Sequence, residues 1–310
     1  MAQYLVTGGA GFIGSHLCRR LLADGHAVRI LDDLSSGSRA NIAEIADEVE
    51  FVVGNLCDEA LLDKVLTGVD YALHHAAVAS VQTSVERPVF EQHVNAVGTL
   101  RFFDAARRAG VGRVVFAGSA AAYGNNPTVP KREQMIPEPE SPYAISKVMG
   151  EYYARVYSQI YGLEVVCLRY FNVFGPRQDP SSPYSGVISI FADSMLKGNP
   201  PIIFGDGEQS RDFVYVDNIV EANMRACVAP GAAGRVYNIG CAQSISILQL
   251  VVALNEALGT EIKPDFRPPR PGDVRVSLAD IARARAELGY EPVAQFTTGL
   301  QRTIEWMKSL

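Results

Sequence analysis

The chain has 310 residues, of which 48% are apolar, so it can bury a sizeable core in one large domain or two modest ones. Its net charge of −6 argues against a nucleic-acid partner, because a phosphate backbone requires a basic surface. No apolar stretch reaches the roughly 18 residues of a membrane span, so no membrane partner is expected. The five scattered cysteines lack metal-ligand spacing and predict reduced thiols in a cytoplasmic protein without a metal site. The strand-like run that starts at Gln3 is not expected in a signal peptide.

Short apolar runs alternate with longer helical patterns in the first half of the chain. Strands are expected at 4–8, 27–32, 49–54, 71–77, 113–119 and 164–170, and helices at 14–25, 95–110 and 141–157. Because near-continuous apolar strands alternate with amphipathic helices, the pattern predicts an α/β fold with a doubly wound parallel sheet and helices on both faces.

The composition changes after Phe171, where Gly and Pro become frequent and the expected elements become shorter. We therefore expect a first domain over residues 1–172 and a second, smaller mixed α/β region over residues 173–310. A strand pattern followed by a helix pattern predicts that residues 212–238 return to the first sheet.

A glycine-rich stretch, "VTGGAGFIGSH" (6–16), follows the first expected strand and opens a helix. Gly8, Gly11 and Gly14 permit a tight turn and let a pyrophosphate reach backbone N–H groups at the helix N-terminus. The next strand ends in Asp32, whose carboxylate can accept both hydroxyls of an adenosine ribose. Asp32 and the neighbouring Asp33 would repel a 2′-phosphate, so the stretch predicts a Rossmann-type domain that binds NAD in preference to NADP.

Tyr143 and Lys147 are four residues apart in "SPYAISKVMGEYYARVY" (141–157), so they share one face of the expected helix. An ammonium near a phenol favours the phenolate, which makes Tyr143 a candidate general base. Ser119 ends the expected strand 113–119, at the edge where ligands bind in such sheets. His74 and His75 point to opposite faces of their strand, and we interpret them as packing residues rather than metal ligands.

The glycine loop, Asp32, Ser119 and the Tyr143/Lys147 pair together resemble the extended short-chain dehydrogenase/reductase superfamily. Within it the chain is similar to the NAD-dependent nucleotide-sugar epimerase/dehydratase family, and most of all to its UDP-glucose/UDP-N-acetylglucosamine 4-epimerases. "LRYFNVFGPRQDP" (168–180) and "GDGEQSRDFVYVDN" (205–218) look like substrate-side motifs of that family. The resemblance implies tightly held NAD, a UDP-sugar substrate, a nucleotide-sugar-binding region over residues 173–310, and a homodimer.

The family's activities differ in the residues after the serine. Its 4,6-dehydratases carry an Asp-Glu pair and its decarboxylases a glutamate where this chain has Ala120 and Ala121. The resemblance therefore favours 4-epimerisation of UDP-Glc/UDP-Gal through a transient 4-keto sugar, with Tyr143 as the base. Two alternatives stay open: epimerisation of another nucleotide sugar such as UDP-glucuronate, and a non-catalytic NAD-binding regulatory or scaffold protein.

The resemblance also assigns roles to further residues. The implied catalytic residues are Ser119, Tyr143 and Lys147. The implied cofactor-binding residues are Gly8, Gly11, Phe12, Ile13, Gly14, Asp32, Asp33, Ser36, Asn55, Leu56, Ala76, Ala77, Asn95, Tyr143, Lys147 and Tyr170. The implied substrate-binding residues are Ser80, Ser119, Tyr143, Asn172, Arg211, Arg270, Asp273 and Ser277.

Two of these positions carry a further expectation. Asn55 stands where the family often has an adenine-binding Asp, and an amide presents a different donor–acceptor pattern to adenine. Ser277 occupies the position that walls the C2 side of the sugar, where a bulky Tyr would exclude an N-acetyl group. The small serine predicts that UDP-GlcNAc and UDP-GalNAc are also accepted.

Overall fold

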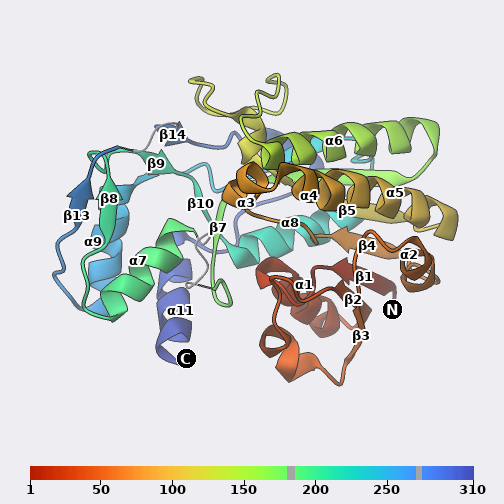
Figure 1. Ribbon diagram of the computed structural model, residues 1–310, viewed down its shortest axis with the longest axis horizontal. Coiled ribbons are helices and arrows are strands. Elements are labelled where there is room, and N and C mark those ends of the chain that lie inside the picture. Colours follow the sequence, from red (N-terminus) through yellow and green to blue (C-terminus); the bar gives the residue numbers. More distant parts are fainter. Residues whose placement is uncertain (180–185, 270–273) are drawn as a thin grey trace.

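Seven parallel strands form the central sheet of the computed structural model, which describes residues 1–179, 186–269 and 274–310 (Figure 1). The spatial order is β11-β6-β5-β4-β1-β2-β3. The strands are β1 (Gln3–Thr7), β2 (Ala27–Asp32), β3 (Val49–Val53), β4 (Tyr71–His74), β5 (Arg113–Ser119), β6 (Glu164–Tyr170) and β11 (Val236–Ile239). Their buried apolar runs explain why the sheet is covered on both faces, and the predicted doubly wound α/β fold is confirmed.

The strand order reverses between β1 and β4. The chain builds β1, β2 and β3 outward in one direction and then crosses to β4, β5 and β6 on the other side. At such a switch point the loops after neighbouring strands diverge and leave a crevice at the carboxyl ends of the strands. Thr7, Asp32, His74 and Ser119 are the last residues of four of these strands, so they lie along this edge.

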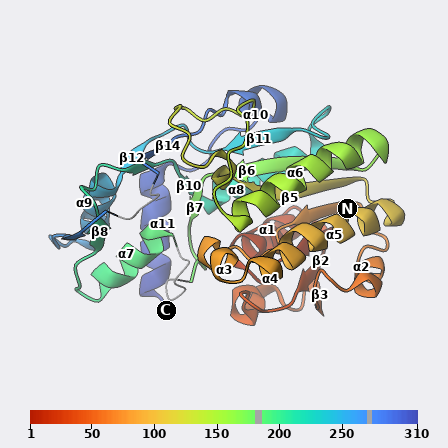
Figure 2. The ribbon, with the colours of Figure 1, turned by 45° about the horizontal axis from the view of Figure 1, so that its top comes forward.

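Helices cover both faces of the sheet (Figures 1 and 2). On one face, α1 (Phe12–Ala23), α8 (Val216–Val228) and α10 (Ala282–Leu288) contribute to one apolar core cluster, together with residues of the 3₁₀ segment η1 (Arg39–Ile45). On the other face, α2 (Glu59–Val65), α5 (Gly98–Ala109) and α6 (Pro142–Ile160) contribute to a second cluster. Three short elements lead into α5: α3 (Val81–Glu86), α4 (Pro88–Gln92) and the π-helical turn η2 (His93–Val97). The 3₁₀ turn η3 (Ala120–Tyr123) follows β5.

A second region lies beside the carboxyl edge of the sheet, on the left in Figure 1. Its core is formed by α7 (Val187–Leu196), α9 (Ile247–Leu258), α11 (Phe296–Lys308) and strands that include β7 (Asn172–Phe174) and β10 (Phe213–Tyr215), which pair in parallel. Two further small sheets join β12 (Ile245–Ser246), β9 (Ser210–Arg211) and β14 (Val276–Ser277), and β13 (Asp265–Arg267) with β8 (Ile202–Phe204). Phe12 and Ile13 of α1 pack against this core, so the first turn of α1 contacts both regions.

The chain returns from the second region to the large sheet. After β9 and β10 it forms α8, and β11 then pairs with β6 at the sheet edge. Among the residues that the structure describes, no helix is long and apolar enough to cross a membrane. All five cysteines are free.

Candidate active site

The loop between β1 and α1 is closed by contacts that only glycine allows. Gly8 has φ +71°, and a Cβ there would lie 2.9 Å from the backbone N of Ala76. A Cβ on Gly14 would lie 2.1 Å from the carbonyl oxygen of Gly8, so α1 could not approach the loop. The loop is thus a glycine-lined cradle, and α1 begins at Phe12 after the cap residue Gly11, which has no side chain to bond the first N–H groups. Its first N–H groups therefore remain as donors for an anion.

Asp32 lies against this loop from the end of β2. Its carboxylate accepts hydrogen bonds from the backbone N–H of Ala10 (2.9 Å) and Leu34 (2.8 Å). Burial raises the pKa of the Asp32 carboxyl, and these two donors oppose that rise. The amide of Asn55 donates to Asp33 at 2.8 Å, so these two predicted cofactor residues form one polar pair at the same edge.

Thr7 joins the switch-point loops and was missed by the sequence analysis. Its hydroxyl hydrogen-bonds His74 Nδ1 (2.9 Å) and accepts from the backbone N–H of His75 and Ala76, both at 3.1 Å. A lone hydroxyl at the end of an apolar strand, just before the glycines, was the signal that could have found it. His74 also stacks on Phe102, with ring centroids 4.3 Å apart, which agrees with the packing interpretation.

Ser119, Tyr143 and Lys147 meet where β5 ends. The hydroxyl of Ser119 accepts from the backbone N–H of Ala121 at 3.1 Å and makes a hydrogen bond with Tyr143. The helix that carries Tyr143 and Lys147, α6, begins at Pro142 after the cap residue Ser141, whose hydroxyl accepts from Ala144 N at 3.2 Å. Lys147 is buried, and its Nζ donates to the carbonyl of Ala117 at 2.9 Å. The same Nζ lies 5.7 Å from the centre of the Tyr143 ring.

Burial shifts the pKa values of both members of this pair. Burial raises the pKa of Tyr143, while its hydrogen bond to Ser119 lowers it. Burial lowers the pKa of Lys147 to about 8. The ammonium of Lys147 donates its hydrogen bond to the Ala117 carbonyl, and the expected effect of this ammonium on the ionisation of Tyr143 stays a prediction. The groups of the protein alone therefore keep Tyr143 protonated at neutral pH.

Three predicted substrate residues come together on the second region. Ser277 on β14 lies opposite Arg211 on β9, and an Arg211 Nη1 donates to the carbonyl of Val274 at 2.5 Å. Asn172 on β7 donates its backbone N–H to the carbonyl of Asp212 at 3.1 Å. Arg270 and Asp273 lie outside the described residues.

The buried carboxylate of Asp212 organises these strands and was also missed. It accepts from the backbone N–H groups of Cys241 (2.8 Å), Ala242 (3.0 Å) and Ala279 (3.1 Å). An acid directly after Arg211 and inside an apolar strand was the only sequence signal for it.

The remaining predicted residues are spread along the carboxyl edge of the sheet. Ser80 is buried, and its hydroxyl caps α3 by accepting from Thr83 N at 2.9 Å. The side-chain amide of Asn95 holds both backbone groups of Val78, at 2.8 Å and 3.0 Å. The hydroxyl of Tyr170 hydrogen-bonds His75 Nε2 at 2.9 Å and receives a bond from Asn223 at 2.8 Å. Leu56 is buried, Ser36 is exposed after β2, and Ala77 follows β4 in a loop.

The model of the "NAD dependent epimerase/dehydratase family" matches residues 4–240, which is most of the chain. The chain belongs to this family. The match confirms the predicted family, the prediction of an NAD-dependent enzyme, and NAD as its cofactor.

Named members of the family align with nearly the whole chain. The UDP-glucose 4-epimerase of Mycolicibacterium smegmatis is 43% identical over 314 residues, 98% of each protein. The structure of UDP-glucose 4-epimerase with UDP-glucose from Thermotoga maritima is 40% identical, covers 99% of each chain and superposes with a TM-score of 0.94. The UDP-N-acetylglucosamine 4-epimerase from Methanobrevibacter ruminantium, in complex with UDP-N-acetylmuramic acid, is 39% identical over 99% of this chain and 98% of its own, with a TM-score of 0.95.

The family also includes other activities at lower identity. The dTDP-glucose 4,6-dehydratase of Streptomyces niveus is 35% identical over 317 residues, 99% of this chain and 93% of its own. Overall similarity therefore does not separate epimerase from dehydratase, and the residues of the site must do so.

The residues present fit NAD. The cradle at Gly8 and Gly14 leaves room for a pyrophosphate against backbone N–H groups, and Asp32 lies beside it to bind a ribose. Lys147 and Tyr143 lie at the neighbouring strand end, where the nicotinamide half of an NAD bound across the switch point would lie. When bound, NAD supplies a hydrogen acceptor and a positive charge near the phenol.

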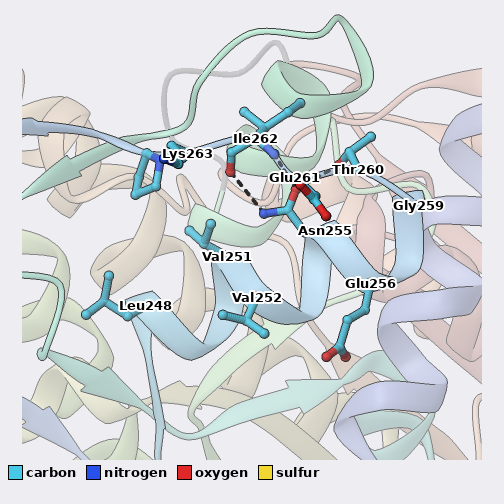
Figure 3. Close-up of a pocket in the computed structure, with 11 residues that line it drawn as sticks. Leu248, Val251, Val252, Asn255, Glu256, Gly259, Thr260, Glu261, Ile262 and Lys263 are labelled. Carbon is cyan, nitrogen blue, oxygen red and sulfur yellow. Dashed lines mark hydrogen bonds between the residues drawn. The ribbon is translucent and has the colours of Figure 1, made fainter.

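A separate hollow of about 600 Å³ lies on the outer side of the second region, along α9 and residues 259–264 (Figure 3). Asn255 shapes it by bonding both backbone groups of Ile262, at 2.8 Å and 2.9 Å. None of its lining residues belongs to the predicted site of this family member.

Proposed function

We propose that the protein interconverts UDP-hexoses at C4: UDP-Glc with UDP-Gal, and UDP-GlcNAc with UDP-GalNAc. The observation that carries this proposal is the meeting of Ser119, Tyr143 and Lys147 at the end of β5, followed by two alanines in place of carboxylates.

Tyr143 acts as the general base in this proposal. Its phenolate takes the proton of the sugar 4-hydroxyl, and Ser119 donates a hydrogen bond to the same sugar oxygen. Since burial keeps the pKa of Tyr143 high in the protein alone, the phenolate depends on the positive charge that the oxidised cofactor brings. Loss of the C4 hydrogen as a hydride, for which bound NAD would be the acceptor, gives a 4-keto sugar. Return of the hydride to the opposite face of the sugar, and of the proton from Tyr143 to the 4-oxygen, inverts C4.

The alanines support epimerisation over dehydration. Dehydration across C5 and C6 needs an acid and a base close to the sugar, and Ala120 and Ala121 offer neither. Both alanines are partly exposed in η3, directly beside Ser119. A 4-keto sugar held there can turn and be reduced, but it meets no carboxyl at these positions.

Arg211, Asn172 and Ser277 are the proposed residues for the UDP-sugar, together with Arg270 and Asp273. An arginine binds a diphosphate through two parallel N–H donors, and Arg211 lies in register with Ser277 on the neighbouring strand. A serine side chain leaves space where an N-acetyl group would point, which supports acceptance of the N-acetylated sugars.

We also propose a homodimer that pairs through α6. The side chains of Ile145, Tyr152, Val156 and Ile160 are all exposed and recur at helical spacing along this helix. They form one apolar stripe that no described part of the chain covers. A large exposed apolar stripe is typical of a protein–protein interface.

The test uses purified protein without added NAD and follows the configuration of the sugar C4 by proton NMR. UDP-Glc and UDP-GlcNAc are offered separately, and conversion of both is expected. A Tyr143→Phe variant is the control: it should keep the fold and bound NAD but lose about 10²- to 10⁴-fold in turnover.

Each other outcome has a definite meaning. Conversion of UDP-Glc alone would retain the mechanism and reject the argument from Ser277. Failure with both sugars, even after NAD is added, would reject the proposed substrates, and conversion of UDP-glucuronate instead would identify the alternative epimerase. Failure with all three would favour the non-catalytic alternative.

A further inference from the structure

A buried carboxylate lies next to the catalytic helix and has no part in the mechanism above. Glu91, on α4, is fully buried. Its Oε1 accepts from the hydroxyl of Ser146 at 2.7 Å and from the amide of Asn95, and its Oε2 accepts from the amide of Gln92 at 2.7 Å. A buried charge is retained only when donors satisfy it, and here three donors from α4, η2 and α6 do so.

These bonds connect Glu91, through Ser146 and Gln92, to the segment of α6 that carries the catalytic pair. Ser146 lies immediately before Lys147 on α6, and its hydroxyl is also 2.9 Å from the carbonyl oxygen of Tyr143. Gln92 donates to the carbonyl of Pro142, the first residue of α6, at 2.7 Å. The start of α6 is therefore held from one side by the Glu91 cluster.

The π-helical turn η2 brings the cluster together. Asn95 lies in this turn and also holds both backbone groups of Val78. Single π turns inside helices are frequent at functional sites. Here Asn95 connects Glu91 to the loop after β4, at the edge where the catalytic residues lie.

The other titratable groups near α6 are uncharged, paired with an opposite charge, or exposed to solvent. Burial lowers the pKa of His75 to about 3 and that of His74 well below its usual value, so the rings at the end of β4 and directly after it are uncharged. Glu151, on α6 itself, forms a buried pair with Arg169 of β6 at 2.7 Å. His93 on η2 is exposed.

The charge of Asp104, on α5, raises the pKa of Tyr157, which lies farther along α6. Among the described residues, Glu91 is the carboxylate whose charge acts on the catalytic pair. It raises the pKa of Tyr143 and also that of Lys147.

We propose that Glu91 is a positioning residue of the catalytic centre: it orients the start of α6 through Ser146 and Gln92, and it places a carboxylate beside the segment that carries Tyr143 and Lys147. This inference rests on the proposed function for its kinetic part and on the structure alone for its spectroscopic part.

The test compares wild type with Glu91→Gln, which removes the charge and keeps an oxygen to accept from Ser146. The ionisation of Tyr143 is followed by tyrosinate absorbance, as the difference between each protein and the same protein carrying Tyr143→Phe. In Glu91→Gln the titration of Tyr143 is expected about 1 pH unit lower. The pH profile of kcat for UDP-Glc should shift in the same direction on both limbs.

A Ser146→Ala variant separates charge from packing. It removes the hydrogen bond but leaves the carboxylate, so kcat should fall while the titration of Tyr143 stays within a few tenths of a pH unit. If Glu91→Gln does not fold, Glu91→Asp, which withdraws the charge by one methylene, should show a smaller shift of the same sign.

Two results are decisive. A Tyr143 titration that is unchanged in the folded Glu91 variants would overturn the proposal, whatever happens to kcat. If the wild type converts no sugar, the proposed function fails, but the spectroscopic titration still tests the role of Glu91.

Discussion

Burial shifts the pKa values of Tyr143 and Lys147 in opposite directions. It raises that of the phenol and lowers that of the ammonium to about 8, because a site with little water disfavours both charged forms. At neutral pH, Lys147 therefore carries its charge by a narrow margin and Tyr143 carries none. Such a pair responds strongly to any charge placed beside it, whether from Glu91 or from a bound cofactor.

Ser277 is the residue at which substrate breadth should be decided. Replacing it with Tyr places a ring at the position that the resemblance assigns to the C2 side of the sugar. Ser277→Tyr is expected to lower kcat/KM for UDP-GlcNAc at least about tenfold relative to UDP-Glc, since steric exclusion acts only on the larger substituent. Steady-state kinetics with both sugars measure the ratio.

Ser277→Ala is the matched control, because alanine is as small as serine and should leave the ratio of the two sugars within about twofold. Equal losses for both sugars in Ser277→Tyr would mean that the ring distorts β14 and its neighbour Arg211, and would contradict selective exclusion.

At the scale of elements, the strands could be predicted closely from the sequence and their ends less well. The ranges 27–32, 113–119 and 164–170 agree with β2, β5 and β6, because their apolar runs are continuous and end in polar residues. The strand expected at 71–77 ends at His74, where the hydroxyl of Thr7 accepts from the backbone N–H groups of His75 and Ala76. The helix expected from residue 95 begins as a π turn, which a 3.6-residue period cannot indicate.

The candidate site was predictable only in part, for a related reason. Ser119, Tyr143 and Lys147 carry a recognisable spacing, and the structure brings them together. Glu91 and Asp212 carry no such spacing, because each carboxylate is buried by parts of the chain that are distant in sequence, as Ser146 is from Glu91. Cys241 and Ala279, which donate to Asp212, follow it by 29 and 67 residues.

Asp212 should be the main polar tie between the strands that carry Arg211 and Ser277. In Asp212→Asn, a single amide oxygen cannot accept all of the N–H groups that the carboxylate satisfies, so buried donors lose their partners. Each unsatisfied group costs about 1–3 kcal/mol. The melting temperature is expected to fall by about 4–8 °C, measured by calorimetry.

Asp193→Asn provides the control for this stability measurement. Its carboxylate makes a solvent-accessible i,i+4 pair with Lys197 on α7, and such pairs contribute little to stability. Equal melting temperatures for the Asp212 and Asp193 variants would show that the buried tie is not needed.

At the scale of the whole molecule, the apolar stripe on α6 has a consequence for the proposed catalytic centre. The same helix presents Tyr143 and Lys147 at its start and exposes Ile145, Tyr152 and Val156 on its outer side. Burying that side against a second copy would hold α6 from outside, while the Glu91 cluster holds it from inside. Dimerisation and catalysis would then depend on the same element.

Light scattering after size exclusion should therefore give twice the mass of one chain for the wild type. Val156→Glu should shift the measured mass toward that of one chain, because a charge buried without a partner in the interface opposes association. Val252→Glu is the matched control, since Val252 is also an exposed valine on a helix but lies on α9 in the second region. The Val156 variant should also melt at a temperature that rises less with protein concentration than the wild type. A wild type with the mass of one chain at micromolar concentration would contradict the dimer, and α6 would then be held in place by its inner contacts alone. A Val252 variant that dissociates as much as the Val156 variant would show that the interface does not lie specifically on α6.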